Sequence, residues 1–138
     1  MSTNDVSLNK AATIERCLLR IRAVYAGDAA NLTNDLIRQE SILLNLQRAC
    51  EAAIDLAMHC VRRDKLGIPQ DSLDAFDLLV RAGSLESSLA DGLKRMVGFR
   101  NIAVHDYAQI DLEIVRAILE RHLGDLGRFA EQSIRAGA

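Results

Sequence analysis

Residues 100–107 bring together the side chains of this chain that are best suited to proton transfer and to phosphate binding. The segment reads Arg-Asn-Ile-Ala-Val-His-Asp-Tyr. A histidine imidazole titrates near neutral pH and can take or return a proton, which is the role available to His105. The guanidinium of Arg100 can hold a phosphate oxygen and stabilise transition-state charge. Asn101 can position a bound group by hydrogen bonds, and it stays open whether His105 or the phenol of Tyr107, beside a cation, acts in proton transfer.

This set would suit cleavage of a phosphodiester without a metal. RNA carries its own nucleophile, the 2′-hydroxyl, so no nucleophilic side chain would be required. From the spacing alone, however, a structural histidine near a helix end is the commoner explanation, because structural networks also gather such residues. The sequence has no Gly-rich phosphate loop, Walker motif or GxSxG element, which disfavours phosphate-binding ATPases and serine hydrolases.

The helical pattern around the segment limits how Arg100 and His105 can meet. Met96 and Val97 lead into it on an apolar face, but Asn, His, Asp and Tyr are weak helix formers, so we expect the helix to end or fray here. On an unbroken helix the two side chains would lie about 140° apart. Either the helix ends near Val104 and folds His105 back, or a two-fold dimer juxtaposes the segments of two protomers.

About five helices are predicted to position this segment, because apolar residues recur at three- and four-residue steps. Ser84 is expected to cap the helix that carries the segment, and Asp111 to cap the last helix. Leu36, Leu73 and Ile114 are assigned to buried apolar faces. Residues 29–34 are read as a connection. The other predicted helices cover residues 7–25, 35–65, 72–81 and 111–134.

Composition favours a single all-helical, cytoplasmic domain over residues 1–138, with an ordered core at about 8–134. The chain is 49% apolar but only 4% aromatic, which suits helix packing better than a β-sandwich. No stretch resembles a membrane span or a signal peptide. Cys17, Cys50 and Cys60 lack CxxC spacing and are predicted to be buried free thiols in a reducing compartment. A net charge of -2 means that any nucleic-acid contact is local, brief or shared with a second protomer.

Further polar residues lie on the longest predicted helix and near the segment. Four of them follow one another at four-residue steps: Gln47, Glu51, Asp55 and His59. A single His and a Gln make a poor ligand set, so a metal site is disfavoured against a solvated face, an interhelical seam or support for the segment. Lys94 and Arg95 could touch RNA phosphates. His122 is predicted to be solvated.

The segment and its surroundings resemble a known family. Arg100-x4-His105-x-Tyr107 looks like the Arg-x4–6-His signature of HEPN domains. More narrowly, MVGFRNIAVHDY resembles the HepT toxins, which are paired with a minimal nucleotidyltransferase antitoxin called MntA. The stretches CEAAIDLAMH, LGIPQDS and AFDLL-x3-G match the layout of that family, and the resemblance covers roughly residues 8–134.

The resemblance implies a HEPN helical bundle that forms a homodimer, with the signature lining the cleft between subunits. It implies metal-independent cleavage of RNA, with tRNA as the expected substrate class, and it carries over Arg100 and His105 as catalytic residues. Asn101, Asp106, Lys94 and Arg95 would be supporting or RNA-positioning residues. No metal or cofactor is expected for the chain itself.

The resemblance also implies control by an MntA-like antitoxin, which would transfer AMP from ATP onto Tyr107. The added phosphate and bulk would repel RNA and occupy Arg100. A half-buried tyrosine with a local hydrogen bond is the structural alternative for Tyr107. For the whole chain, the alternatives are a HEPN binding module without nuclease activity, acting as partner subunit of the nucleotidyltransferase, and a purely structural helical dimer.

Overall fold

The computed structural model describes the backbone of residues 3–137 and the side chains of residues 5–136, and this part of the chain is helical apart from its turns. The predicted all-α fold class is confirmed. Residues 1, 2 and 138 of the expected domain lie outside the described residues. The elements are α1 (Thr3–Tyr25), α2 (Ala30–Thr33), α3 (Leu36–Arg63), α4 (Ser72–Arg81), α5 (Ser87–His105), the 3-10 turn η1 (Tyr107–Gln109), α6 (Leu112–Arg121) and α7 (Leu123–Gly137).

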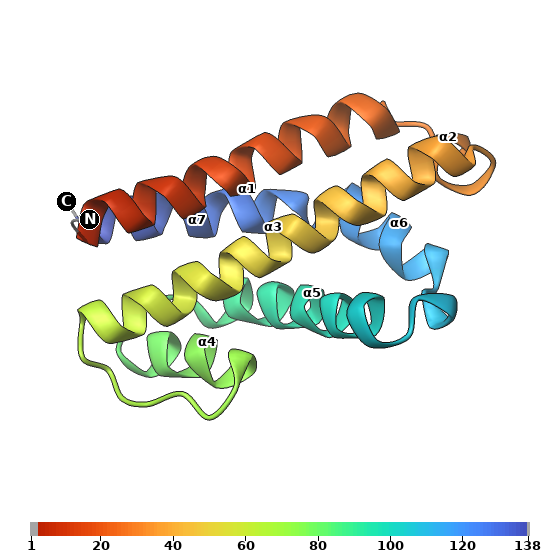
Figure 1. The fold of residues 1–138 in the computed structure, drawn as a ribbon. Helices are drawn as coiled ribbons and strands as arrows, with labels where there is room; N and C mark the ends of the chain where they lie inside the picture. The colour runs from red at the N-terminus through yellow and green to blue at the C-terminus, as the bar shows by residue number, and fades with distance from the viewer. Residues whose placement is uncertain (1–2, 138) are drawn as a thin grey trace.

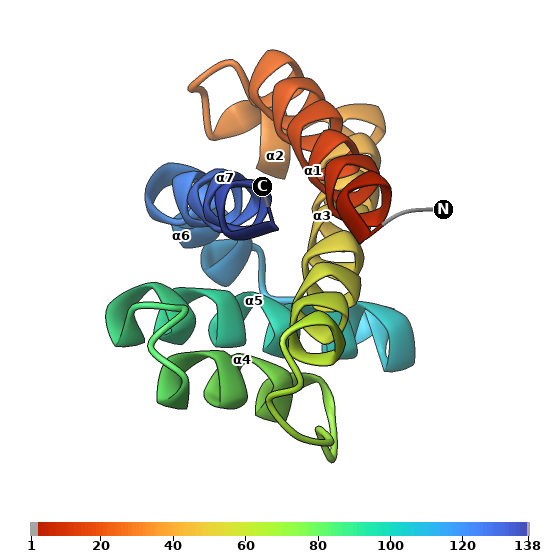
Figure 2. The same ribbon diagram turned by 90° about the vertical axis from the view of Figure 1, so that its left-hand side faces the viewer.

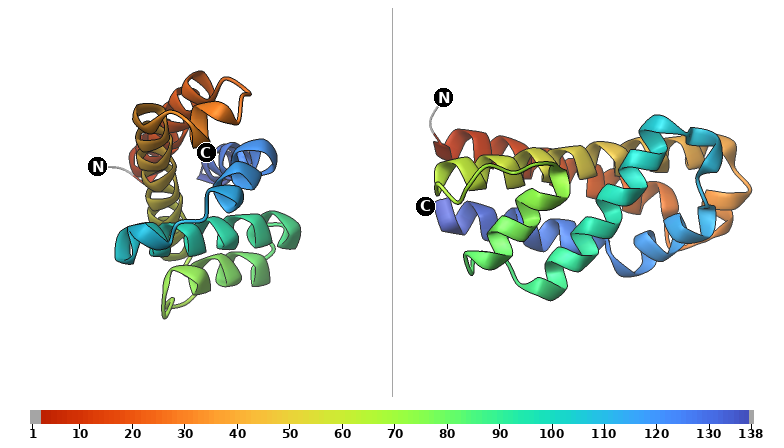
Figure 3. Two further views of the ribbon diagram at one scale, coloured as in Figure 1. Left: turned by 90° about the vertical axis from the view of Figure 1, so that its right-hand side faces the viewer. Right: turned by 90° about the horizontal axis from the view of Figure 1, so that it is seen from below.

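The long helix α3 is the backbone of the bundle, as Figure 1 shows. It packs side by side with α1 in the opposite direction, and α7 packs against both of them. On the other side of α3, α4 and α5 lie next to each other as a second layer (Figure 2). The carboxyl-terminal end of α5 crosses α3 and projects past it, which the left view of Figure 3 shows from the opposite side.

Apolar burial holds these layers together. The largest buried side chains come from every long helix and include Ile14, Leu46, Phe76, Leu93 and Leu126. Phe76 of α4 and Phe129 of α7 meet edge to face, with ring centroids 5.7 Å apart. None of the helices in the described part of the chain is long and apolar enough to cross a membrane.

The three cysteines are buried and free, as predicted. Burial raises the pKa of all three thiols, and it raises that of Cys50 to about 12. At neutral pH these groups are therefore protonated, apolar core side chains rather than nucleophiles.

Aspartates begin three of the helices. Asp35, Asp71 and Asp111 each accept a hydrogen bond from a backbone N–H in the first turn that follows, so the predicted cap at Asp111 is confirmed. The predicted cap at Ser84 is wrong. The backbone N–H of Ser84 donates to the carbonyl of Leu79 at 2.9 Å and so closes the end of α4, and α5 begins only at Ser87.

The single helix predicted for residues 111–134 is two helices, because the chain bends at His122. Gly124 and Gly127 weaken helix continuity at this point. The bend lets α6 reach α2 while α7 runs back along α1 and α3. The predicted connection 29–34 also contains a short helix, α2.

Three residues assigned to apolar faces are exposed instead. Leu36, Leu73 and Ile114 are 66%, 38% and 53% exposed. Each lies in the first turn of its helix. The helical period places these residues on the apolar side of their helices. They are exposed because the first turns extend past the core that would cover them.

Candidate active site

Helix α5 carries the segment 100–105 and continues without a break through His105. The N–H of Asp106 still donates to the carbonyl of Ile102 at 2.8 Å, which is the regular helical bond. The alternative in which His105 folds back at Val104 is therefore wrong. The side chains of Arg100 and His105 leave the helix about 140° apart.

Arg100 faces α3, where a carboxylate meets it. Its Nε lies 3.6 Å from Oε1 of Glu51, and the same oxygen accepts a hydrogen bond from Nε2 of Gln47 at 3.2 Å. Nη1 of Arg100 donates to Oδ1 of Asn101 at 3.0 Å. The Nε atom is buried and makes no hydrogen bond, while the guanidinium as a whole keeps a partly exposed edge. Glu51 thus orients the guanidinium of Arg100 from the side of α3, and the exposed edge can still present N–H donors to an anion.

His105, Asp106 and Tyr107 lie where α5 gives way to η1. All three are exposed, and Tyr107 is 54% exposed. Asp106 ends α5 with a non-helical backbone, and Tyr107 starts the 3-10 turn. The alternative of a half-buried Tyr107 does not hold, because more than half of this residue is exposed to solvent.

The predicted polar row on α3 forms an interhelical seam. Glu51 pairs with Arg100 of α5, and Asp55 pairs with Lys10 of α1 at 3.2 Å. Glu51 and Gln47 therefore support Arg100, while Asp55 joins α3 to α1, so the alternatives of a seam and of support for the segment each describe part of the row. Within residues 5–136, no group of three or more His, Cys, Asp or Glu side chains could hold a metal ion.

His122 is not solvated, contrary to the prediction. It is half-buried, and its Nδ1 lies 3.2 Å from Oδ2 of the buried Asp125, which also pairs with Arg128. The bend between α6 and α7 turns the imidazole toward this carboxylate.

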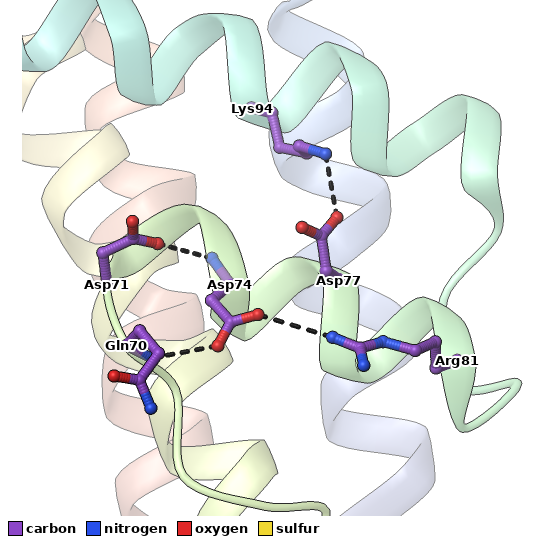
Figure 4. Close-up of polar contacts among 6 residues, drawn as sticks. All are labelled: Gln70, Asp71, Asp74, Asp77, Arg81 and Lys94. Carbon is purple, nitrogen blue, oxygen red and sulfur yellow. Dashed lines mark hydrogen bonds and ion pairs between the residues drawn. The ribbon is translucent and has the colours of Figure 1, made fainter.

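The two cations predicted to touch RNA differ in their surroundings. Figure 4 shows Lys94 directed at Asp77 of α4, with 2.8 Å between the ammonium and the carboxylate. The hydrogen bond to Asp77 raises the pKa of Lys94. Arg95 is exposed on the outer side of α5. The RNA roles of both stay predictions, and a phosphate bound by Lys94 would have to compete with Asp77.

Exposed apolar and small residues beside His105 are the part of the site that the sequence analysis missed. Ile102 and Val104 are 44% and 46% exposed. Gly98 is exposed too, and a Cβ built on it would meet open space. Gly98, Ile102 and His105 share one side of α5. The spacing of Gly98 and Ile102, four residues apart, was the available signal.

Comparison with known proteins shows which family has this fold and this segment. The chain matches the family described as Ribonuclease HepT-like over residues 14–133. It is 49% identical to the mRNA nuclease HepT of Shewanella oneidensis, over 93% of this chain and 96% of that protein.

Two solved structures are similar over nearly the whole chain. One is the tri-AMPylated HEPN toxin of Shewanella oneidensis in complex with an MNT antitoxin, with a TM-score of 0.88, 48% identity and 99% of both chains covered. The other is a tyrosine-to-alanine mutant of the MntA–HpeT toxin–antitoxin, with a TM-score of 0.86, 47% identity, and 95% of this chain and 98% of that chain covered.

The helical bundle and the Arg-x4-His segment at the end of α5 are those of a HEPN-type ribonuclease. The chain belongs to the HepT-like ribonuclease family. The predicted family is thereby confirmed, and the predicted class of function, a HepT-type toxin nuclease, agrees with the relatives.

Proposed function

We propose that this chain is the toxin of a toxin–antitoxin pair and an endoribonuclease that cuts RNA without a metal. The observation that carries the proposal is the exposed Arg-x4-His segment, with Arg100 oriented by Glu51, in a chain of the HepT-like ribonuclease family. The relative from Shewanella oneidensis is named a nuclease, and the solved relatives are toxins bound to antitoxins.

In the proposed reaction, His105 takes the proton of a ribose 2′-hydroxyl as its oxygen attacks the adjacent phosphorus. The bond from phosphorus to the 5′-oxygen breaks, and that oxygen leaves with a proton from an imidazolium or from water. Arg100 stabilises the extra negative charge on the non-bridging oxygens. The products are a 2′,3′-cyclic phosphate and a 5′-hydroxyl.

A second copy of the chain would complete the site. Arg100 faces α3 and His105 faces away from it, so one chain does not present both to a single phosphate. Gly98 and Ile102 offer a close-approach, apolar surface on the side of His105, which suits another helix. A two-fold dimer would place the His105 of each chain opposite the Arg100 of its partner.

Control would act at Tyr107. In the proposed reaction the phenolic oxygen attacks the α-phosphorus of ATP on an MntA-like antitoxin, AMP is transferred and pyrophosphate leaves. The exposure of Tyr107 supports this, as does the tri-AMPylated relative. ATP is then a substrate of the antitoxin rather than a cofactor of this chain.

The RNA class and the compartment are the finer parts of the proposal. The name of the relative indicates mRNA, whereas the family resemblance implies tRNA, so both belong in the assay. We place the activity in the cytoplasm, where RNA, ATP and a nucleotidyltransferase partner occur together.

The test is cleavage of end-labelled tRNA and mRNA by the chain made without antitoxin, in EDTA. We expect cuts that leave 2′,3′-cyclic phosphate ends, lost in Arg100→Ala and in His105→Ala. Arg135→Ala, on an exposed part of α7, is the matched control. Antitoxin binding without any cleavage would favour the non-catalytic binding module, and cleavage that survives His105→Ala would contradict the assigned chemistry.

A further inference from the structure

Three arginines on the outer face of α1 and α3 lack carboxylate partners. Arg16 and Arg20 of α1 and Arg48 of α3 are exposed, and we call them the arginine strip. Within residues 5–136, no Asp or Glu forms an ion pair with any of them. Arg16 donates to the neutral hydroxyl of Thr13, at 3.5 Å.

The register of α1 against α3 brings the strip together. Lys10 pairs with Asp55 at 3.2 Å at one end, and Arg38 donates to the carbonyl of Val24 at 2.9 Å at the other. Arg16 lies six residues, about 9 Å, beyond Lys10, and Arg48 lies seven residues, about 10 Å, before Asp55. Arg16 and Arg48 therefore lie at about the same level of the two helices, with Arg20 one turn further along α1.

The charges of these arginines also affect the pKa of a thiol buried between the helices. Burial raises the pKa of Cys17, and the positive charges of the arginine strip oppose that rise. Burial and Glu51 raise the pKa of Cys50, and Arg100 opposes that rise. Cys17 also acts on Cys50. The strip and Arg100 thus lie near the same pair of buried thiols, the strip near Cys17 and Arg100 near Cys50.

The nearby carboxylates do not neutralise the strip. On the outer row of α3, Glu51 is occupied by Arg100 and Asp55 by Lys10. Glu15 of α1 lies beside Gly127 of α7, on another side of the helix. Among the other arginines, six have a carboxylate partner: Arg38, Arg63, Arg81, Arg116, Arg128 and Arg135. Arg22, Arg62, Arg95 and Arg121 form no ion pair within residues 5–136, so the strip is set apart by the grouping of its charges beside Arg100 and not by the lack of partners alone. In a chain of net charge -2, the strip is a local positive surface next to Arg100.

We propose that the arginine strip binds the phosphate backbone of the RNA whose scissile phosphate lies at Arg100. Guanidinium groups bind phosphate oxygens in a bidentate manner and independently of base sequence. The strip would hold the strand next to the site, while Arg100 and His105 act on one phosphate. This inference rests on the proposed function. It assigns the phosphate contacts to the arginines of α1 and α3 instead of Lys94, because Lys94 already pairs with Asp77.

The test measures binding separately from cleavage. In a His105→Ala background, a fluorescent single-stranded RNA is titrated at several KCl concentrations with the parent chain and with the triple variant Arg16→Gln, Arg20→Gln, Arg48→Gln. The control triple variant Arg81→Gln, Arg121→Gln, Arg135→Gln removes the same charge from exposed positions elsewhere. We expect about tenfold weaker binding for the strip variant only, and a salt slope that is smaller by about 2.

The same substitutions in the His105 chain should raise KM for RNA cleavage and leave kcat nearly unchanged. Arg48→Lys, which keeps the charge, should restore most of the binding that Arg48→Gln loses. Circular dichroism melts of the variants should match the parent, because the three residues are exposed and form no ion pairs in the described part of the chain.

Equal Kd and equal salt slope in the parent and the strip variant would overturn the proposal. So would a change of oligomeric mass in light scattering, which would assign the strip to a contact between copies. Loss of antitoxin binding with RNA binding intact would assign it to the antitoxin and overturn the proposal as well. A parent chain that never cleaves RNA, yet binds it through the strip, would refute the proposed nuclease function and leave this inference standing.

Discussion

The Nε atom of Arg100 lies 3.6 Å from Oε1 of Glu51, and this ion pair joins α5 to α3 where α5 leaves the core. Gln47 donates to the same carboxylate oxygen at 3.2 Å and restricts its position. The pair therefore orients the guanidinium of Arg100 rather than holding the fold, because both side chains are partly exposed.

Glu51→Gln should lower the rate of RNA cleavage without unfolding the chain. We expect kcat to fall by about tenfold because the guanidinium loses its orientation. KM should stay equal or fall, since a negative charge next to bound RNA is removed. The change in unfolding free energy should stay below about 1 kcal/mol. Asp55→Asn, which breaks the pair with Lys10, is the control, and an equal loss of kcat there would contradict a specific role for Glu51.

Mixing two inactive variants should restore cleavage if the site is shared between copies. A mixed dimer of Arg100→Ala and His105→Ala chains would contain one site with both residues intact and one with neither. Random exchange should therefore recover about a quarter of the parent activity, measured with labelled RNA after mixing. No recovery, with mixed dimers demonstrated by mass, would place both residues of each site in one chain.

Tyr107→Phe should abolish modification while keeping the toxin fold. Incubated with its antitoxin and ATP, the parent chain should gain mass in steps of AMP and lose RNA cleavage, because the added phosphates occupy Arg100. The variant should keep its mass and stay active. Tyr25→Phe, at a buried tyrosine of α1, is the control that should still be modified. Mass steps on the Tyr107→Phe chain would assign the modification elsewhere.

Gly92→Ala should destabilise the chain because the close approach of α5 and α7 requires glycine. A Cβ on Gly92 would overlap the carboxylate of Asp125, whose position His122 and Arg128 also fix. We expect a loss of about 1–3 kcal/mol in urea unfolding. Gly124→Ala, where a Cβ meets open space, should be neutral or stabilising, and equal effects at the two positions would refute this account.

Stability should fall at alkaline pH because of Cys50. Its pKa is raised to about 12 in the folded chain, above the ordinary value of 9.0, so folding favours the protonated thiol. This stabilisation is complete below pH 9 and is lost as the pH rises from 9 toward 12. At pH 10 the loss from this group should reach about 1.4 kcal/mol. Urea unfolding of the parent and of Cys50→Ala at pH 8 and pH 10 measures the difference, and identical pH dependence in both would contradict the prediction.

The sequence by itself determined the features that depend on residues one or two helical turns apart along the chain. The long helices follow from apolar periodicity, the cap at Asp111 from one side chain and the next backbone N–H, and the buried thiols from their apolar surroundings. The candidate residues Arg100, His105 and Tyr107 also came from the sequence, through a short segment and its resemblance to a family.

The tertiary structure decided what depends on how whole helices sit against each other. Ser84 looks like a helix cap, yet its backbone closes the preceding helix, and the bend at His122 turns that imidazole toward Asp125. The same holds for the pairing of Glu51 with Arg100 and for the grouping of the arginine strip. These arrangements join residues that are far apart along the chain, and they form only when packing fixes the level and rotation of each helix, which helical periodicity alone does not specify.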